Sequence, residues 1–251
     1  MKRFKSQVIR YASLPSTNTE AARLAVQGAE EGLCIIADEQ TAGRGRLQRS
    51  WLSPKGAGIY FSTLLRPLIP LDQWPLITFV AALAVSDALR VACDLETDIK
   101  WPNDLLAGER KICGILAEAI ETPQGRGVVV GIGINLTKQA FSADLTNVAI
   151  SVEEATTRHP EKESILAALV QAIAHWYLAL QGTGGQRKIL EAWAARSSYA
   201  EGKWVRVVNG DDVISGITRG VESDGALRVE TSATEMRIVR TGDVASVRPA
   251  S

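Results

Sequence analysis

The stretch that decides the fold is "KWPNDLLAGERKICGILAEAIE", residues 100–121. Pro102 lacks an amide hydrogen and has a fixed φ, so it interrupts any central strand or helix that would continue through it. The segment after it, residues 105–120, predicts two strands joined by a turn at Ala107-Gly108-Glu109. The valine- and glycine-rich residues 125–136 predict one more strand. This run of strands lacks the regular strand–helix alternation of a doubly wound nucleotide-binding fold.

Outward from this stretch, apolar periodicity and turn residues predict the remaining elements. Thr17 and Glu20 form a T-x-x-E capping box, which predicts a helix from there to about Gly28. Further strands are expected at residues 6–12, 32–39 and 58–65. Further helices are expected at residues 73–92, 161–181 and 186–197.

The pattern of the sequence changes near residue 200, from helical periodicity to short apolar runs between turn residues. Four short strands are predicted there, "KWVRVV", "VISGITRGV", "ALRVET" and "MRIVR". They are separated by the turn sequences "NGDD", "ESDG" and "TGD", which predicts a small β-barrel or β-sandwich. We therefore expect an α+β protein with two domains. The first, residues 1–198, would hold a mixed sheet with flanking helices, and the second, residues 199–251, would be all β.

Composition excludes several classes of function. The 251 residues carry 28 Lys+Arg and 28 Asp+Glu, a balance that argues against a general nucleic-acid binder. The odd number of cysteines, three, and the absence of C-x-x-C predict an intracellular protein without a disulfide framework. Two histidines are too few for a His/Cys metal site. The N-terminus lacks the apolar segment of a signal peptide, and the polar residues within 74–92 favour a core helix over a membrane span.

A basic loop, "TAGRGRLQRSW" at residues 41–51, places three arginines around two glycines. The glycines would let the backbone turn tightly and approach a ligand, and arginine offers a planar set of donors suited to carboxylates and phosphates. Taken alone, the loop is compatible with a solvated basic turn, a nucleic-acid contact or a cradle for an anion.

Three further motifs carry polar groups that a ligand could use. Lys100, Asn103 and Asp104 surround Pro102, and their carboxylate suits Mg²⁺ or an arginine, although Asn and Asp are also common in turns. Lys111 enters an apolar strand, which is costly unless the ammonium is paired or faces a cavity. The "STN" sequence at residues 16–18 precedes a helix, where it could bind a ligand or simply cap the helix. No P-loop is present, and "GIGIN" lacks the third glycine of G-x-G-x-x-G.

Together these motifs resemble the catalytic domain of biotin–protein ligases. The matching segments follow one another in order: "STN" 16–18, "EQTAGRGRLQRSW" 39–51, "GIYFS" 58–62, "KWPNDL" 100–105, "RKICGILAE" 110–118 and "GIGINL" 131–136. The tail, residues 200–249, resembles the small SH3-like C-terminal domain of that family. The resemblance implies a catalytic domain of the biotin–lipoate ligase type, similar to class II aminoacyl-tRNA synthetases.

The resemblance also implies an activity and its partners. Such an enzyme makes biotinyl-5′-AMP from biotin and ATP with Mg²⁺, releasing pyrophosphate. It then forms a carbon–nitrogen bond between biotin and a lysine of a biotin carboxyl carrier protein, typically of acetyl-CoA carboxylase. Because "STN" already begins at residue 16, the resemblance implies a form without an N-terminal DNA-binding repressor domain. We expect a cytoplasmic enzyme that binds neither DNA nor a membrane and that could dimerise through a sheet edge.

Roles for individual residues follow from the same resemblance. Those expected at the biotin head group and its surroundings are Ser16, Thr17, Asn18 and Gln40. Those expected to close over biotin and the adenylate are Arg44, Gly45 and Arg46. Lys111 would meet the biotin carboxylate and the α-phosphate, and Gly114 would line the biotin pocket. Those expected on the ATP and metal side are Arg46, Trp51, Lys100, Asn103, Asp104 and Asn135. Catalysis would rest on Lys111, Arg46 and Asp104, with Asp104 as the Mg²⁺ ligand and as the group that orients or deprotonates the acceptor lysine.

Three alternatives remain at this point. The C-terminal domain could be an independent peptide-binding module. A lipoate– or octanoate–protein ligase shares the fold, but those families carry a different arginine- and glycine-rich motif and lack "KWPND". A nucleic-acid-binding protein could use the arginine loop on phosphates, although the balanced charge weighs against it.

Overall fold

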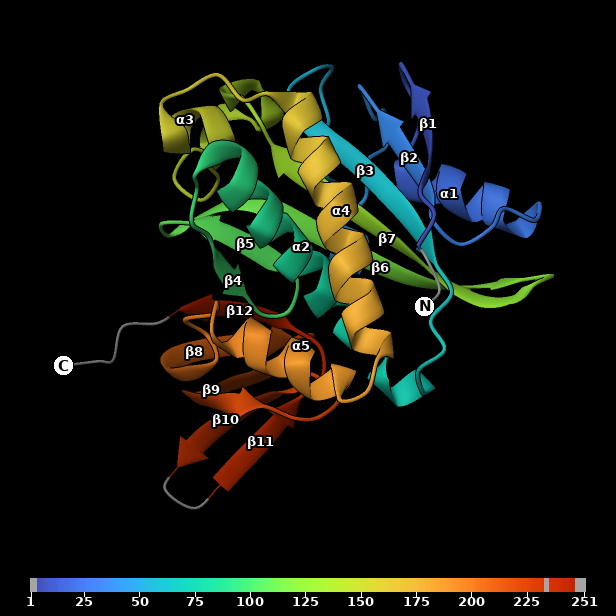
Figure 1. Ribbon diagram of the computed structural model, residues 1–251. Coiled ribbons are helices and arrows are strands. Elements are labelled where there is room, and N and C mark those ends of the chain that lie inside the picture. The colour runs from blue at the N-terminus through green and yellow to red at the C-terminus, as the bar shows by residue number, and fades with distance from the viewer. Residues whose placement is uncertain (1–3, 233–234, 247–251) are drawn as a thin grey trace.

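A seven-stranded mixed sheet forms the centre of the protein, which is described here from a computed structural model covering residues 4–232 and 235–246 (Figure 1). The strand order is β1-β2-β3-β7-β6-β5-β4. The strands are β1 (Gln7–Tyr11), β2 (Leu33–Ala37), β3 (Gly58–Leu65), β4 (Asp98–Lys100), β5 (Asp104–Ala107), β6 (Arg110–Thr122) and β7 (Gly125–Asn135). The β1–β2 pair is parallel and the other neighbouring pairs are antiparallel. The mixed sheet expected from the sequence is confirmed.

The decisive stretch folds as its sequence predicts. β4 ends at Lys100, directly before Trp101 and Pro102, and β5 begins at Asp104. β5 and β6 form a hairpin whose turn has Gly108 at φ +61°, a conformation that favours glycine. The hairpin then leads into the long β6–β7 pair.

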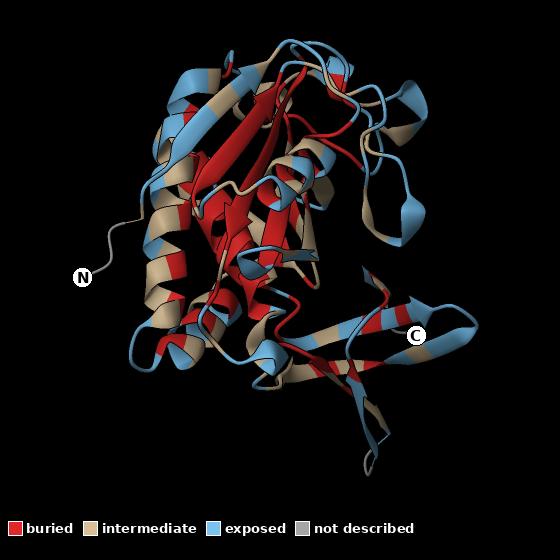
Figure 2. Cartoon of the chain, turned by 90° about the vertical axis from the view of Figure 1, so that its right-hand side faces the viewer, coloured by how far each residue is buried: buried red, intermediate tan, exposed pale blue. Residues whose placement is uncertain are grey.

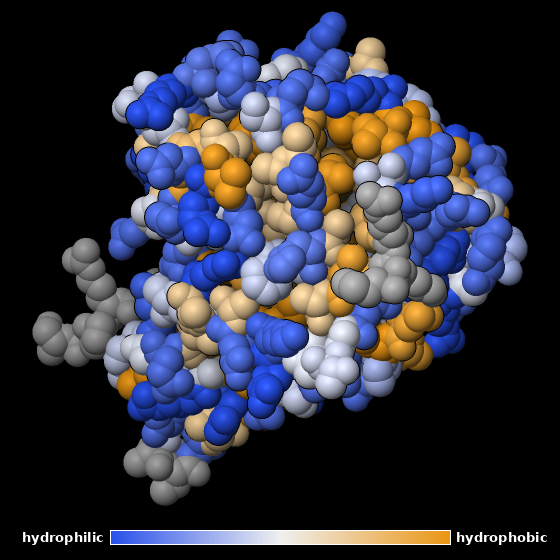
Figure 3. Space-filling model, viewed as in Figure 1, coloured by the Kyte–Doolittle hydropathy of each residue, from blue (hydrophilic) through white to orange (hydrophobic). Residues whose placement is uncertain are grey.

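Helices cover the two faces of the sheet unequally (Figures 1 and 2). One face carries α1 (Thr17–Val26), which is also the crossover between the parallel strands. The other carries α2 (Leu76–Cys93), which α4 (Lys162–Gln181) and α5 (Gly185–Ala194) cover in turn, with the short α3 (Val152–Thr156) nearby. Because α2 lies between the sheet and other helices, its apolar residues are buried on nearly all sides, as expected for a core helix. On the outer helical face, apolar side chains are interspersed among hydrophilic ones (Figure 3).

Two apolar cores follow from this arrangement. β3 is buried along its whole length because alternate side chains enter opposite cores. Ile59, Phe61 and Leu65 pack in the larger core with α2, and Leu64 packs in the smaller core under α1. Residues of even number on β3 therefore face the α1 side of the sheet, the side on which the polar motifs of the sequence gather.

The start of α1 differs from the predicted capping box by one residue. Ser16, not Thr17, is the N-cap, and its hydroxyl accepts a hydrogen bond from the Thr19 amide at 3.5 Å. Glu20 does not bond back to the cap. It accepts a hydrogen bond from the Tyr11 hydroxyl at 2.8 Å and pairs with Arg23, because these two side chains reach it from the adjacent strand and the next helical turn.

A second, five-stranded antiparallel sheet follows α5, in the order β11-β10-β9-β8-β12. Its strands are β8 (Glu201–Asn209), β9 (Asp212–Val221), β10 (Leu227–Ser232), β11 (Glu235–Val239) and β12 (Asp243–Ser246). The sequence predicts the first four of them but not β12. The indole N–H of Trp101 donates to the Gly225 carbonyl at 2.9 Å, and Gly225 packs on α2, so this sheet is docked on the first domain. The expected boundary at 198/199 lies between α5 and β8.

Candidate active site

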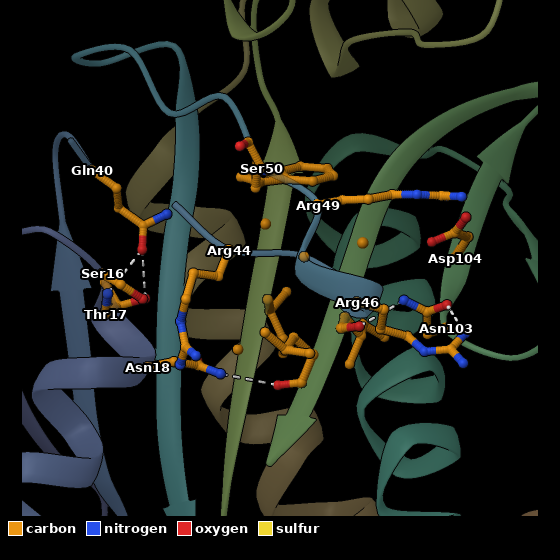
Figure 4. Close-up of a pocket in the computed structure, with 18 of the residues that line it drawn as sticks. Ser16, Thr17, Asn18, Gln40, Arg44, Arg46, Arg49, Ser50, Asn103 and Asp104 are labelled. Atoms are coloured by element: carbon orange, nitrogen blue, oxygen red, sulfur yellow. Dashed lines mark hydrogen bonds between the residues drawn. The ribbon is translucent and has the colours of Figure 1, made fainter. Parts of the chain in front are cut away.

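A cavity of about 130 Å³ opens on the α1 side of the sheet, beyond the area that the helix covers. Its floor is formed by β6 and β7, and the loop of residues 41–51 lies over it (Figure 4). Most of the polar residues singled out in the sequence line it together: Ser16, Thr17, Asn18, Gln40, Arg44, Gly45, Arg46, Trp51, Asn103, Asp104, Lys111 and Gly114. Residues spread over about 100 positions of the chain therefore meet at one place.

Glycines make the floor of the cavity hollow. Gly114 of β6 pairs with Gly133 of β7, and Gly131 pairs with Ser62 of β3. A Cβ atom on Gly133 would lie 2.5 Å from the Trp51 ring, and one on Gly131 would lie 2.2 Å from Asn18 Oδ1. The pattern "GIGIN" is thus not a phosphate loop. Its glycines face the cavity while its isoleucines face the α2 core.

One end of the cavity is a network of neutral polar groups (Figure 4). Gln40 Oε1 accepts hydrogen bonds from the amide and hydroxyl of Thr17 at 2.8 and 3.1 Å. Gln40 Nε2 donates to Ser53 Oγ at 2.8 Å, which fixes the orientation of the amide. Ser62 Oγ lies 2.7 Å from the Thr17 hydroxyl. We call this cluster of Thr17, Gln40, Ser53 and Ser62 the neutral corner.

Asn18 adjoins the neutral corner, and both hydrogens of its side-chain amide are already donated within the protein. Its Nδ2 donates to the Leu116 carbonyl at 3.2 Å and to Glu118 Oε2 at 2.7 Å, and its Oδ1 accepts from Ser62 at 2.6 Å. Both amide hydrogens are therefore used within the protein. The geometry makes Asn18 a residue that positions its neighbours.

The loop over the cavity, residues 41–51, is a short hairpin that we call the lid. Arg44 and Ser50 form an isolated bridge, and the Trp51 amide donates to the Gly43 carbonyl at 2.9 Å. The sequence predicts the tight turn of this loop at Gly43 and Gly45, and this prediction is wrong. The turn is at Leu47 and Gln48, whose φ angles are +53° and +60°. Gly43 is needed for close packing instead, because a Cβ atom there would lie 2.3 Å from the Trp51 carbonyl oxygen.

Three arginines of the lid have partners on three different parts of the protein. Arg44 Nη2 lies 2.7 Å from Glu118 Oε2 on β6. Arg46 donates to Asn103 Oδ1 at 3.1 Å and to Thr241 Oγ1 at 3.2 Å. Arg49 is paired with Asp243 at the start of β12. The second sheet thus takes part in holding the lid.

Positive charge gathers at the end of the cavity away from the neutral corner. Lys111 Nζ lies 2.7 Å from Asp104 Oδ1 and 5.2 Å from the centre of a Trp51 ring. Burial lowers the pKa of the Arg46 guanidinium from its usual value, and the carboxylates of Asp243 and Asp104 oppose that shift. This end suits an anion that would compensate the partly buried cations.

Two of the expected site residues do not line the cavity. Lys100 extends toward Tyr199, with its Nζ 5.9 Å from the ring centre, and burial lowers the pKa of its ammonium. The side chain of Asn135 is buried and donates to the backbone carbonyls of Ile150 at 3.2 Å and Lys111 at 3.4 Å. Asn135 therefore tethers the segment around Ile150 to β6 and β7.

Other residues of the site were not singled out from the sequence. Ser62 was quoted only within "GIYFS", and Glu118 only within "RKICGILAE". Period-two alternation along these strands could have placed both on the face of Gly131. Asp243 reaches the lid through the docking of the second sheet, for which the sequence carries no local signal.

The fit of a divalent cation rests on Asp104. Its Oδ1 is buried and, although it is close to Lys111, it has no partner in hydrogen-bonding geometry. One carboxylate with free acceptor capacity beside an anion site suits Mg²⁺, which commonly takes one or two carboxylates together with substrate phosphates and water. Within residues 4–232 and 235–246, no three His, Cys, Asp or Glu side chains cluster as a metal site.

Comparisons with known proteins agree with this geometry. Residues 11–135 match the biotin/lipoate A/B protein ligase family, and residues 202–245 match the biotin protein ligase C-terminal domain. The chain is 38% identical to the biotin–[acetyl-CoA-carboxylase] ligase of Paracoccus denitrificans, over 86% of this chain and 91% of that protein. It is 37% identical to the bifunctional ligase/repressor BirA of Bacillus spizizenii, over 87% of this chain and 67% of that protein.

A solved structure has a similar fold. The biotin protein ligase from Aquifex aeolicus in complex with biotin and ATP superposes with a TM-score of 0.82, at 26% identity, over 98% of this chain and 100% of that chain.

Proposed function

The chain belongs to the biotin protein ligase family, and from that premise we propose how its residues join biotin to ATP and then to a lysine of an acceptor protein. In the first reaction a biotin carboxylate oxygen attacks the α-phosphorus of ATP, and pyrophosphate leaves. In the second, the acceptor amine attacks the biotinyl carbonyl, AMP leaves, and the amine loses a proton. The enzyme is an ATP-dependent ligase, and this activity is favoured over lipoate ligation.

The observation that carries the residue assignment is the division of the cavity into two chemically different ends. The neutral corner offers amide and hydroxyl groups, which suit the uncharged ureido ring of biotin. Lys111 and Arg46 at the other end suit the biotin carboxylate and the α-phosphate of ATP. A ligand with a neutral polar head and an anionic tail is complementary to both ends at once.

The first reaction brings two anions together, so the protein must lower their repulsion. Lys111 and Arg46 lie where negative charge would grow on the phosphoryl oxygens, and fixed cations of this kind stabilise such a transition state. Holding both reactants in register can contribute up to ~7–11 kcal/mol. The Trp51 ring of the lid, which packs against Gly133 of the floor, would form the wall next to the adenine.

The adenylate is a mixed anhydride that water hydrolyses. The lid covers the cavity, with Arg44 directed toward Glu118 and Arg46 toward Asn103 and Thr241, and it is suited to exclude water until the acceptor arrives. Asp104 would orient or deprotonate the acceptor lysine, because an ammonium has no free electron pair for attack.

Mg²⁺ would be held by Asp104 together with the phosphates of ATP. Bound there, the ion would neutralise part of the phosphate charge. The acceptor is the biotin carboxyl carrier protein of acetyl-CoA carboxylase by analogy with the relatives, whose names specify that enzyme. We place the reaction in the cytoplasm, on the basis of the free cysteines Cys34, Cys93 and Cys113.

A direct assay tests this function. A purified carrier domain is incubated with the enzyme, ATP and Mg²⁺, together with biotin, lipoate or octanoate in separate reactions. Intact-mass spectrometry should show modification with biotin and a far smaller yield with the other two acids. Equal or greater modification with lipoate or octanoate would overturn the assignment.

A further inference from the structure

A carboxylate outside the cavity joins the lid to the neutral corner. Glu118 Oε2 accepts hydrogen bonds from Arg44 Nη2 and from Asn18 Nδ2, each at 2.7 Å. These two donors come from the lid and from α1, while Glu118 itself belongs to β6. One carboxylate oxygen thus connects three elements that are far apart in the sequence.

On the side away from the lid, Glu118 is held by Asn18 of helix α1. Asn18 is 4% exposed, and its three polar contacts fix the orientation of its amide. It fits there because Gly131 has no side chain, since a Cβ atom would lie 2.2 Å from Asn18 Oδ1. Glu118 therefore presents its charge from a fixed position.

On the lid side, the partner of Glu118 is Arg44, whose side chain is partly exposed and lies on a loop. The Arg44 side chain is 46% exposed, and the lid turns through two non-glycine residues with positive φ, Leu47 and Gln48. Such a backbone conformation persists only when surrounding contacts hold it. The ion pair between Arg44 and Glu118 is one of the contacts that join the lid to the rest of the protein, and Glu118 in turn bonds Asn18 beside the neutral corner.

We propose that Glu118 is a positioning residue that fastens the lid, through Arg44, over the substrate head group. This inference rests on the proposed function of the cavity. Glu118 sets how long the lid stays closed, and with it how long biotin and the adenylate are retained. It does not itself touch the reacting atoms.

The test is a conservative substitution. Glu118→Gln keeps an oxygen for Asn18 Nδ2 but removes the charge that faces Arg44. We expect biotin to dissociate roughly 5–10-fold faster, because the charge-assisted hydrogen bond to the partly exposed Arg44 side chain becomes a neutral one. Adenylate release should rise similarly, while the adenylation rate at saturating biotin should stay within about twofold, because the cations at the reacting end are untouched.

Two further measurements separate positioning from a general structural role. Trypsin cleaves after arginine, so it should cut the lid faster in Glu118→Gln than in the wild type, without ligand and with an unchanged unfolding temperature. Glu118→Asp, which keeps the charge, should restore at least part of the slow dissociation. The matched control is Glu121→Gln, on the same strand as Glu118, which breaks the 2.7 Å pair with Arg126 of β7 and should alter neither measurement.

Different results overturn different statements. If wild-type enzyme modifies the carrier with biotin but Glu118→Gln shows wild-type dissociation and lid cleavage, the role of Glu118 is refuted while the function stands. If Glu118→Gln and Glu118→Asp both lower the unfolding temperature and all rates together, Glu118 is structural and the proposal also fails. If the wild type does not use biotin, the proposed function fails, although the lid cleavage still reports on Glu118.

Discussion

The Lys111 ammonium lies 2.7 Å from Asp104 Oδ1, and both side chains line the end of the cavity opposite the neutral corner. Lys111 thus has its ion-pair partner on the neighbouring strand β5. The pair gives a fixed positive charge a defined position on a sheet, which is more rigid than a loop. The role proposed for Lys111 depends on that position.

Lys111→Ala should slow adenylate formation about 10²–10³-fold, as expected for the loss of one donor to developing charge. Single-turnover measurement of biotinyl-AMP formation checks this. Lys162→Ala, which breaks a 2.7 Å pair with Asp38 outside the cavity, serves as the control and should leave the rate unchanged. Adenylation at wild-type speed in Lys111→Ala would show that the lysine has another role.

Arg46→Gly should release the adenylate before transfer. The substitution removes contacts of the lid with Asn103 and Thr241, so the mixed anhydride would escape and react with any lysine. Streptavidin blotting of a protein mixture should then show many labelled bands. A single acceptor band, as expected for the control Arg126→Gly, would contradict the prediction.

Asp243→Asn should weaken the attachment of the lid to the second sheet. Arg49 and Asp243 are both partly exposed, so the effect should be modest, about 2–5-fold faster tryptic cleavage of the lid, in line with the energies of exposed ion pairs. Asp212→Asn, which breaks a pair with Arg237 within the second sheet, is the matched control. Equal cleavage rates in the two variants would mean that Asp243 does not hold the lid.

Gly133→Ala should displace the Trp51 ring, because the new Cβ atom would lie 2.5 Å from it. Overpacking of this kind costs about 1–3 kcal/mol, so the KM for ATP should rise, by up to roughly 150-fold if the whole cost falls on ATP binding. Steady-state adenylation at saturating biotin measures the change. Gly182→Ala, where the nearest atom would be 3.5 Å away, is the control. An unchanged KM would place the adenine away from Trp51.

Stability should fall in alkaline solution through Tyr199. Burial, aided by Asp98, Glu109 and Asp104, raises the pKa of this phenol to about 12. Between pH ~10, where an unfolded tyrosine loses its proton, and that value, the unfolded state binds fewer protons than the native state, so stability decreases as pH rises. Tyr199→Phe should make this decrease shallower in denaturant titrations from pH 9 to 12. An identical slope in the variant would exclude the contribution.

Local sequence signals predicted the fold well where a single segment contains the cause. The β5–β6 hairpin is an example, because Pro102 and the turn at Gly108 lie within it. The cap of α1 was wrong by one residue, since the choice between Ser16 and Thr17 depends on Gln40, which takes the Thr17 hydroxyl from another part of the chain. β12 was missed because its pairing with β8 is a long-range contact of a four-residue strand.

In the site, too, local motifs were predicted well and contacts between distant segments were not. The motif segments identified Thr17, Gln40, Arg44, Arg46 and Lys111, which all line the cavity. Whether a side chain is free for a ligand depends on its neighbours in space, and Asn18 and Asn135 are both committed to protein partners. The position of the turn in the lid also could not be predicted from the local sequence. Its two glycines predicted the tight turn, yet positive φ occurs at Leu47 and Gln48.

The pairing of Arg49 with Asp243 spans 194 residues of sequence. During synthesis on the ribosome, the lid emerges long before its second anchor exists. At ~5–20 residues per second, that interval lasts roughly 10–40 seconds. A nascent chain that could already bind biotin and ATP would lack one attachment of the lid, and would lose reactive adenylate to water or to nearby lysines. Placing an anchor so late in the chain therefore delays full closure of the enzyme until its second sheet has folded.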